Sequence, residues 1–244
     1  MISRYGLREV VLITATAGVG GIAAAVAAAQ VSVWYLAPAV PLLAAWLAGL
    51  AFFRDPSRTA PDAPGILVSP ADGTVTEITR LDCGVGFEGP ALRIGIFLSI
   101  FDVHVNRSPC AGRVLSTAYE RGEFLDARHP ESGHRNEANT IVIEPEDGTP
   151  GPVAVRQIAG LIARRVVCRL KPGDRVQRGE RIGMLKFGSR TELIVRANTG
   201  FAAAVKLGEH VRGGSTTLMG IAAPGSDAVE RQTRRGASPV GPAR

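Results

Sequence analysis

The stretch that decides the fold is KPGDRVQRG, residues 171–179, because the chain contains its pattern twice. The second copy, KLGEHVRGG, spans residues 206–214 and keeps the pattern K-x-G-(D/E)-x-V-x-x-G. Glycines at fixed places supply the positive φ angles that tight turns need. Each copy therefore predicts a turn that leads directly into a short strand.

The repeated pattern resembles the hairpin turn of lipoyl- and biotinyl-like β-sandwiches. The surrounding sequence agrees with it, since short apolar runs separated by Gly, Pro and Asp fill the chain from residue 60 onward. Abundant glycine and proline (29 and 16 residues) with only 5% aromatics also favour short strands and turns. We expect a mainly β, sandwich-like domain over residues 59–224. Residues 225–244 are poor in apolar side chains and predict a disordered tail.

The N-terminal part carries a long apolar segment, with no charged residue between Glu9 and Arg54. As one straight helix it would be ~66 Å long, about twice the hydrocarbon thickness of a bilayer. Polar and proline residues near its middle predict a break, which gives two apolar helices at about 10–29 and 33–53. We expect residues 1–58 to form a membrane anchor, a hairpin whose Gly- and Ala-rich first helix packs closely against the second.

Basic residues flank both ends of this segment: Arg4 and Arg8 before it, Arg54 and Arg58 after it. A hairpin brings both ends to the same side, and the positive-inside rule makes that side cytoplasmic. The expected location is therefore the cell membrane, with the β domain on the cytoplasmic side. A cleaved signal peptide is the alternative, but it fits poorly because a second apolar run follows at once.

The three cysteines, Cys83, Cys110 and Cys168, are far apart and form no CxxC pair. This spacing predicts no disulfide framework and no metal site, and it suits a reducing compartment. The net charge of +6 favours an anionic partner such as lipid or an acidic substrate. No nucleic-acid-binding motif accompanies the charge, so we expect no nucleic-acid partner.

A Gly-Ser pair, Gly188-Ser189, lies at the junction of two apolar runs in GERIGMLKFGSRTELIV, residues 179–195. The other such pair, Gly214-Ser215, directly follows the second repeat and suits a plain turn. A serine hydroxyl can attack the carbonyl of the preceding residue, and elimination of the resulting ester leaves dehydroalanine, which hydrolyses to a pyruvoyl group and ammonia. Most Gly-Ser pairs are turns, so this pair needs a general base nearby to indicate such chemistry.

Among the four histidines, His104 is the best candidate for that base, because it follows a strongly apolar strand in IFDVHVNRSP, residues 100–109. A buried histidine with an ordinary structural role is the alternative. The other histidines lie in a polar loop or, in the case of His210, in a repeat turn that we expect to be exposed. Asp72, in SPADGTV, and Asp102 are the nearby carboxylates, and a turn is the alternative role for Asp72.

Three motifs in order, FFRDPSR…VSPADGTV, IFDVHVNRSP and GERIGMLKFGSR, resemble phosphatidylserine decarboxylases of the short, membrane-anchored bacterial type. The resemblance runs from about residue 30 to 220. It implies a self-cleaving proenzyme whose covalent pyruvoyl group is derived from the serine of the cleavage site.

The resemblance assigns roles to individual residues. Ser189 matches the self-cleaving serine, so the expected cleavage site is Gly188-Ser189, and Asp72 and His104 match the family's PADG and histidine motifs. Asp72 would orient His104, which would deprotonate Ser189 and later return a proton to the product. Arg107 stands where long forms carry a second histidine. With Arg190, Arg107 is a candidate for binding the substrate carboxylate or phosphate.

The implied reaction converts membrane phosphatidylserine to phosphatidylethanolamine through a Schiff base with the pyruvoyl group. The implied products of self-cleavage, chains 1–188 and 189–244, would stay associated as a heterodimer, and a homo-oligomer is compatible with the sequence. Two alternatives belong to other classes. One is a non-enzymatic, membrane-anchored β-sandwich adaptor of an export assembly. The other is a serine hydrolase, although FGSRT lacks the G-x-S-x-G elbow.

Overall fold

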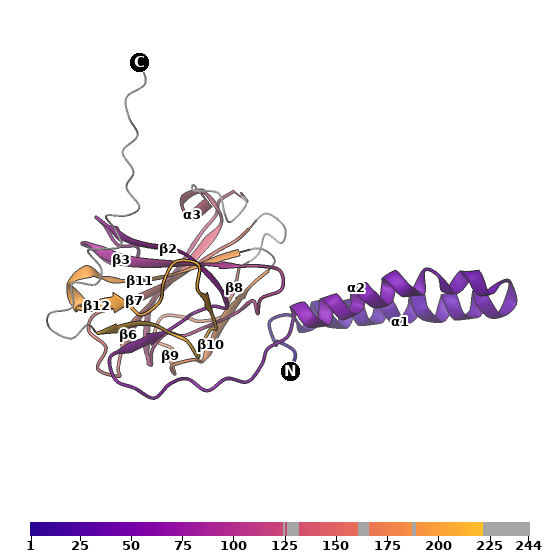
Figure 1. The fold of residues 1–244 in the computed structure, drawn as a ribbon, viewed down its shortest axis with the longest axis horizontal. Coiled ribbons are helices and arrows are strands. Elements are labelled where there is room, and N and C mark those ends of the chain that lie inside the picture. Colours follow the sequence, from indigo (N-terminus) through magenta and orange to yellow (C-terminus); the bar gives the residue numbers. More distant parts are fainter. Residues whose placement is uncertain (124, 126–131, 161–165, 187–188, 222–244) are drawn as a thin grey trace, which may run out of the picture.

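The computed structural model describes residues 1–123, 125, 132–160, 166–186 and 189–221. It consists of a β domain and a hairpin of two long helices that projects from one end of that domain (Figure 1). The prediction of a mainly β fold with an N-terminal pair of apolar helices is confirmed. The expected tail, residues 225–244, lies outside the described residues.

The hairpin contains α1 (Leu7–Gln30) and α2 (Ala39–Phe52), joined by a short 3-10 helix, η1 (Val33–Leu36). The second α-helix begins later than residue 33 because Pro38 caps it and Pro41 stands in its first turn, where a missing N–H costs nothing. Both α1 and the η1–α2 segment are long and apolar enough to cross a membrane, and their side chains are almost entirely unburied.

Small residues bring the two helices close together, as the glycine-rich sequence of α1 predicted. A Cβ atom on Gly20 would lie 2.6 Å from a methyl group of Leu42, and one on Gly49 would lie 2.4 Å from Ile13. The backbones can approach this far only because those atoms are absent.

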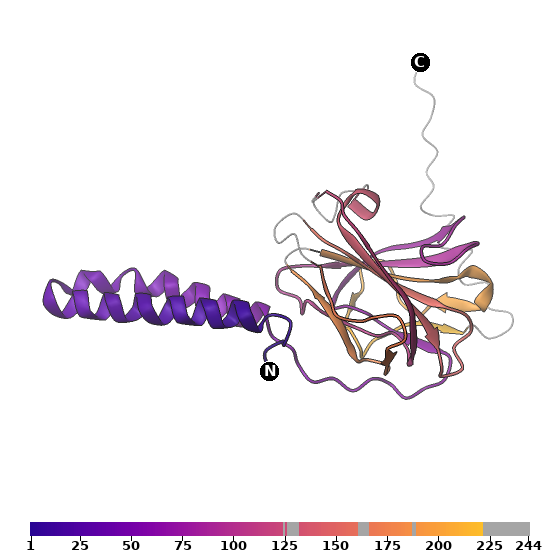
Figure 2. The same ribbon diagram turned by 180° about the vertical axis from the view of Figure 1, so that it is seen from behind.

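The β domain is built from antiparallel strand pairs (Figures 1 and 2). In the described residues these pairs form one eight-stranded sheet and two three-stranded sheets. The order of the large sheet is β13-β2-β3-β11-β7-β6-β5-β9, and the small sheets are β4-β10-β8 and β1-β14-β12. The strands are β1 (Ile66–Val68), β2 (Gly73–Leu81), β3 (Ala91–Leu98), β4 (Val105–Arg107), β5 (Gly112–Glu120), β6 (Ala138–Pro145), β7 (Val153–Ile158), β8 (Val166–Cys168), β9 (Arg175–Val176), β10 (Arg181–Leu185), β11 (Ser189–Arg196), β12 (Phe201–Ala203), β13 (His210–Val211) and β14 (Thr217–Ile221).

The main core lies between the large sheet and the two small ones. Its fully buried members come from both sides, for example Ile94 and Leu193 from the large sheet, Ile182 from β10 and Leu218 from β14. Alternate residues of β11 face this core, so Leu193 and Val195 point inward together with Thr191 and Ser189.

The sequence repeat is also a structural repeat. In the first copy, Gly173 donates to the carbonyl of Val114 and Val114 donates to that of Asp174, both at 2.8 Å. In the second copy, Gly208 and Glu209 make the same pair of bonds with Val75, at 2.8 and 2.9 Å. The strands that follow, β9 and β13, close opposite ends of the large sheet.

A second pair of matched segments accompanies these turns. Ser69 Oγ donates to the carbonyl of Ala71, and Ser108 Oγ donates to that of Cys110, both at 2.7 Å. Each segment then enters a long strand through a glycine that pairs with a repeat strand, Gly73 with Val211 and Gly112 with Val176. In this correspondence Asp72 takes the place that Ala111 has in the other half, so the fold itself does not require an aspartate there.

Candidate active site

Ser189 is the first residue of β11 and pairs with Leu98 of the neighbouring strand β3. Its side chain is fully buried and points toward the core, as the alternation along β11 requires. In the part of the chain that the structure describes, its Oγ has no hydrogen-bond partner. Gly188, the other half of the expected cleavage site, lies outside the described residues.

His104 precedes β4 and is fully buried. Its Nδ1 lies 2.9 Å from the backbone carbonyl oxygen of Asp102. Because a carbonyl only accepts hydrogen bonds, Nδ1 must carry the ring proton, which leaves Nε2 as the basic nitrogen. This Nε2 is buried and has no partner among the described residues.

The surroundings of His104 keep the ring neutral. Burial lowers the pKa of His104 to about 4, with Arg54 acting in the same direction. The Asp102 carbonyl and the charges of Asp102 and Asp72 act against this shift but do not cancel it. At neutral pH the side chain is therefore a free base inside the protein, ready to accept a proton.

Two sets of contacts bring His104 and Ser189 into one neighbourhood. Leu185 donates to the carbonyl of His104 at 3.0 Å, and Ser189 pairs with Leu98, so segments 98–104 and 185–189 border each other at both ends. Two residues further along each strand, Asn106 Nδ2 donates to Thr191 Oγ1 at 3.1 Å. Thus inward-facing side chains of β4 and β11 meet inside the domain. His104 Nε2 and Ser189 Oγ belong to the same layer of side chains.

Asp72 does not make the contact with His104 that we expected. Both of its carboxylate oxygens bind the guanidinium of Arg58, one of them at 2.6 Å, and Oδ1 also accepts the backbone N–H of Gly213 at 2.8 Å. Asp72 therefore influences His104 through its charge and not through a hydrogen bond. Its catalytic role stays a prediction.

The structure adds a second histidine that sequence reasoning set aside. His210 Nε2 lies 2.9 Å from Asp102 Oδ1, so Asp102 joins His104 through its carbonyl and His210 through its carboxylate. Burial raises the pKa of Asp102, but hydrogen bonds from His210 and Ser99 outweigh it and lower the pKa overall. No sequence signal links positions 102 and 210, because β13 joins β2 only when the large sheet is complete.

Arg107 and Arg190 are both held by carboxylates. Arg190 lies on the outer face of β11, where it binds Glu77 and Glu192. Arg107 is buried and donates to Asp55 and to the carbonyls of Pro56 and Gly179, each at 2.9 Å. Their proposed part in substrate binding stays a prediction.

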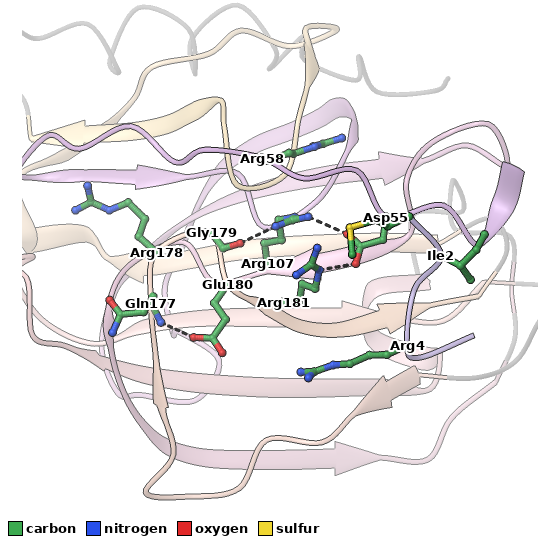
Figure 3. A pocket seen from close by; sticks show the side chains of 11 residues that line it. Ile2, Arg4, Asp55, Arg58, Arg107, Gln177, Arg178, Gly179, Glu180 and Arg181 are labelled. Atoms are coloured by element: carbon green, nitrogen blue, oxygen red, sulfur yellow. Dashed lines mark hydrogen bonds and ion pairs between the residues drawn. The ribbon is translucent and has the colours of Figure 1, made fainter. Parts of the chain in front are cut away.

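Arg107 also lines a cavity of about 470 Å³ at the base of the hairpin (Figure 3). Residues from both ends of the hairpin meet β10 there, and Asp55 bridges Arg107 and Arg181. The cavity is lined by Met1, Ile2, Arg4, Asp55, Arg58, Arg107, Gln177, Arg178, Gly179, Glu180 and Arg181.

A buried serine and a neutral, buried histidine lie in one layer of a β domain that carries an apolar helical hairpin. Comparison with known proteins identifies the family. The family model of phosphatidylserine decarboxylase matches residues 48–219. The chain therefore belongs to the phosphatidylserine decarboxylase family, and this prediction from the three sequence motifs is confirmed.

Individual relatives agree with this assignment. A phosphatidylserine decarboxylase proenzyme of Desulfotalea psychrophila is 45% identical over 169 residues, which are 69% of this chain and 77% of the relative. Proenzymes of the same name from Saccharopolyspora erythraea and Rhodopirellula baltica are 43% and 41% identical, over 74% and 88% of this chain and 75% and 86% of their own lengths. These relatives give no support to the alternative of a non-enzymatic adaptor.

Proposed function

We propose that the chain cleaves itself between Gly188 and Ser189, and that the pyruvoyl group derived from Ser189 then decarboxylates phosphatidylserine to phosphatidylethanolamine. One observation carries the proposal: His104 Nε2 and Ser189 Oγ are both buried and unpaired within the described residues, and they lie in adjoining segments. Buried polar atoms without partners are uncommon in folded proteins, and a catalytic role is one explanation for them; these two are the base and the nucleophile that the motifs single out.

Self-cleavage follows from the state of these two groups. His104 Nε2 accepts the proton of Ser189 Oγ, which attacks the carbonyl carbon of Gly188, and the proton passes to the amide nitrogen as the C–N bond breaks. Removal of the Ser189 α-proton then breaks the Cβ–Oγ bond and releases the Gly188 carboxylate. The dehydroalanine that remains adds water and loses ammonia. Atoms balance with one water as the added reactant, whose oxygen becomes the ketone oxygen of the pyruvoyl group.

The residues present fit a pyruvoyl group at position 189, because the serine is buried, unpaired and fixed at the start of a central strand. Such a group would supply an electrophilic carbonyl that condenses with the substrate amine and draws away the electron pair left when CO₂ departs. Our chain's own contribution is to exclude water and to hold His104 where it can return a proton to the product. Asp72 would stabilise the protonated form of His104 through its charge.

The two chains produced by this cut should remain together. β11 pairs with β3 on one side and β7 on the other, β13 pairs with β2 and β14 pairs with β1. Each of these pairings would join the small chain, 189–244, to the large one, 1–188. Dissociation would therefore require the core to unfold.

The hairpin gives the enzyme a means of reaching a lipid substrate. We place α1 and α2 in the cell membrane, with the β domain on the cytoplasmic side, since Arg4, Arg8, Arg54 and Arg58 all lie at the domain end of the hairpin. A two-tailed phospholipid rarely leaves the bilayer, so the reaction must take place at its surface.

The mass of the denatured protein tests the proposal. We expect two chains, 1–188 and 189–244, with a hydroxylamine-sensitive carbonyl and no free amine on the smaller one. The Ser189→Ala variant should give one uncut chain, whereas Ser215→Ala should be cut as in the wild type. A wild-type chain that stays whole, or a cut before Ser215, would contradict the proposed site.

A further inference from the structure

We propose that the inner end of the helical hairpin belongs to the self-cleavage machinery, with Phe52 and Glu9 acting as positioning residues for His104 and for the segment to be cut. The inference rests on the proposed cleavage at Ser189. It goes beyond the role of the hairpin as an anchor, because it makes the reaction depend on side chains that the hairpin contributes.

Phe52, the last residue of α2, packs directly against His104. The two ring centroids lie 4.3 Å apart at an interplanar angle of 42°, and Phe52 is only 4% exposed. The hydrogen bond from Nδ1 to the Asp102 carbonyl restricts rotation of the imidazole. The contact with Phe52 restricts its movement on the side where the Phe52 ring lies. The ring of Phe52 also forms part of the apolar surface that keeps water from His104.

Glu9, in the first turn of α1, holds Lys186, which precedes the proposed cleavage site. It forms an ion pair with Lys186, whose side chain is 9% exposed. Lys186 follows β10 and stands two positions before Gly188 in the sequence. The hairpin thus touches the base through one helix and the segment leading to the scissile bond through the other.

The base of the hairpin packs closely against the β domain. Val10 of α1 and Phe52 of α2 share a buried apolar cluster with Tyr5, Phe53 and Met184, so both helices pack on β10. A Cβ atom on Gly6 would lie 2.0 Å from the ring of Phe53, a closeness that only glycine allows. Ser3 also donates to the carbonyl of Phe53 at 2.8 Å.

Position matters here because neither His104 Nε2 nor Ser189 Oγ has a hydrogen-bond partner among the described residues that would align it. A displacement of about 1 Å at a reacting group can cost 10²-fold in rate. A rigid hairpin end that holds both His104 and residue 186 would fix their separation. Loss of either contact should therefore slow self-cleavage even when the hairpin remains in the membrane.

The Phe52→Ala variant gives a readout that a merely structural role would not move. It admits water beside His104 and so weakens the effect of burial, which is the largest cause of the low pKa of His104. The nearby charges act in opposing directions, Asp102 and Asp72 against Arg54, so the pKa should return toward 6.5. We expect self-cleavage about tenfold slower at pH 5.5 than at pH 7.5, whereas the wild-type rate stays nearly constant. The matched control is Phe101→Ala, an aromatic 79% exposed in the same loop as His104, which should behave as wild type.

A second variant keeps the test valid if Phe52→Ala does not accumulate. Phe52→Leu preserves most of the apolar volume and should show the same pH dependence, reduced to about threefold. For the contact between Glu9 and Lys186, the Glu9→Gln variant should slow cleavage five- to tenfold at every pH. The control is the exposed neighbour Arg8, and the Arg8→Gln variant should be cut at the wild-type rate. Sedimentation with vesicles of the cell's lipids checks that every variant stays membrane-bound.

The possible outcomes separate this inference from the proposed function. If the wild type is not cut before Ser189, the proposed function fails. If the wild type is cut there, and the Phe52 and Glu9 variants are cut at its rate and with its flat pH profile, the hairpin is only an anchor. Slower cutting with the expected pH dependence in membrane-bound variants supports the inference.

Discussion

The backbone carbonyl of Asp102, and not a carboxylate, accepts the Nδ1–H of His104 at 2.9 Å. The interaction sets the tautomer of the ring without placing a full negative charge against it. Burial keeps the ring neutral against the opposing effect of this hydrogen bond, and the tautomer leaves Nε2 as the nitrogen that can accept a proton. Asp102 thus sets the tautomer of His104 through its backbone carbonyl, which most substitutions at position 102 would leave in place.

The first prediction concerns His104 itself. His104→Gln should slow self-cleavage by at least about 10²-fold, the usual contribution of a general base. Gln keeps a similar volume and can still donate to the Asp102 carbonyl, so the fold should persist. Densitometry of the cut and uncut chains over time measures the rate, with a circular dichroism spectrum to verify folding. Cutting at an unchanged rate would rule out His104 as the base.

The second prediction compares the two aspartates. Asp72→Asn removes a charge that favours protonated His104 and also disturbs Arg58, so self-cleavage should slow at least tenfold. Asp102→Asn removes a charge that acts on His104 more strongly than that of Asp72, but it keeps the carbonyl that His104 uses and leaves the pair of Asp72 with Arg58 intact. We expect it to remain within about threefold of wild type, because we attribute the larger effect of Asp72→Asn to loss of that pair. The reverse order of effects would mean that the contact with His210 matters more than Asp72.

The third prediction is a dependence of stability on pH. The pKa of His104 is about 4 in the folded protein and near 6.5 when unfolded, so the unfolded state binds more protons between these values. His104 therefore contributes a loss of stability as pH falls below 6.5, about 2 kcal/mol between pH 7 and pH 5. We expect His104→Gln, in the uncut Ser189→Ala background, to lose that much less over this range. Urea unfolding in detergent at the two pH values measures the difference, and equal losses in both proteins would contradict it.

The fourth prediction concerns the cavity at the hairpin base. Arg107 and Asp55 form a buried pair, and removal of Arg107 leaves Asp55 with Arg181 as its remaining ion-pair partner and takes a donor from the carbonyls of Pro56 and Gly179. Arg107→Met should destabilise the protein by about 2 kcal/mol. The exposed pair of Arg135 and Glu123 offers a control, since Arg135→Met should cost less than about 1 kcal/mol. Thermal unfolding of the uncut variant measures both. If Arg107 serves only the substrate, its loss would leave stability unchanged.

The sequence predicted features that are encoded locally. The absence of charge between Glu9 and Arg54 marked the helical hairpin, and the two glycine-bearing repeats marked the turns that close the large sheet. Ser189 was distinguished from Ser215 by its place relative to the repeat, and it begins a strand as the two apolar runs suggested. These are properties of short segments, which depend little on the rest of the chain.

The contacts that complete the candidate site are of another kind. His210 reaches Asp102 across 108 positions, and Phe52 reaches His104 from a different part of the molecule. The pairing of Asp72 with Arg58 was also not predictable from the sequence, because the segment after the hairpin has no sequence pattern that predicts its path along the β domain. Such contacts depend on how sheets close and helices dock. The spacing of residues along the chain therefore does not predict them.

Glu9 and Phe52 both precede every strand of the β domain, and the bridge between Ile2 and Arg54 closes the hairpin at its base. During synthesis the hairpin therefore leaves the ribosome complete before β11 exists. β13 and β14, which close the large sheet and one small sheet, emerge last. Under the proposed function, translation would order maturation: a newly made chain would meet the bilayer first, and would acquire the ability to cut itself only after it had arrived.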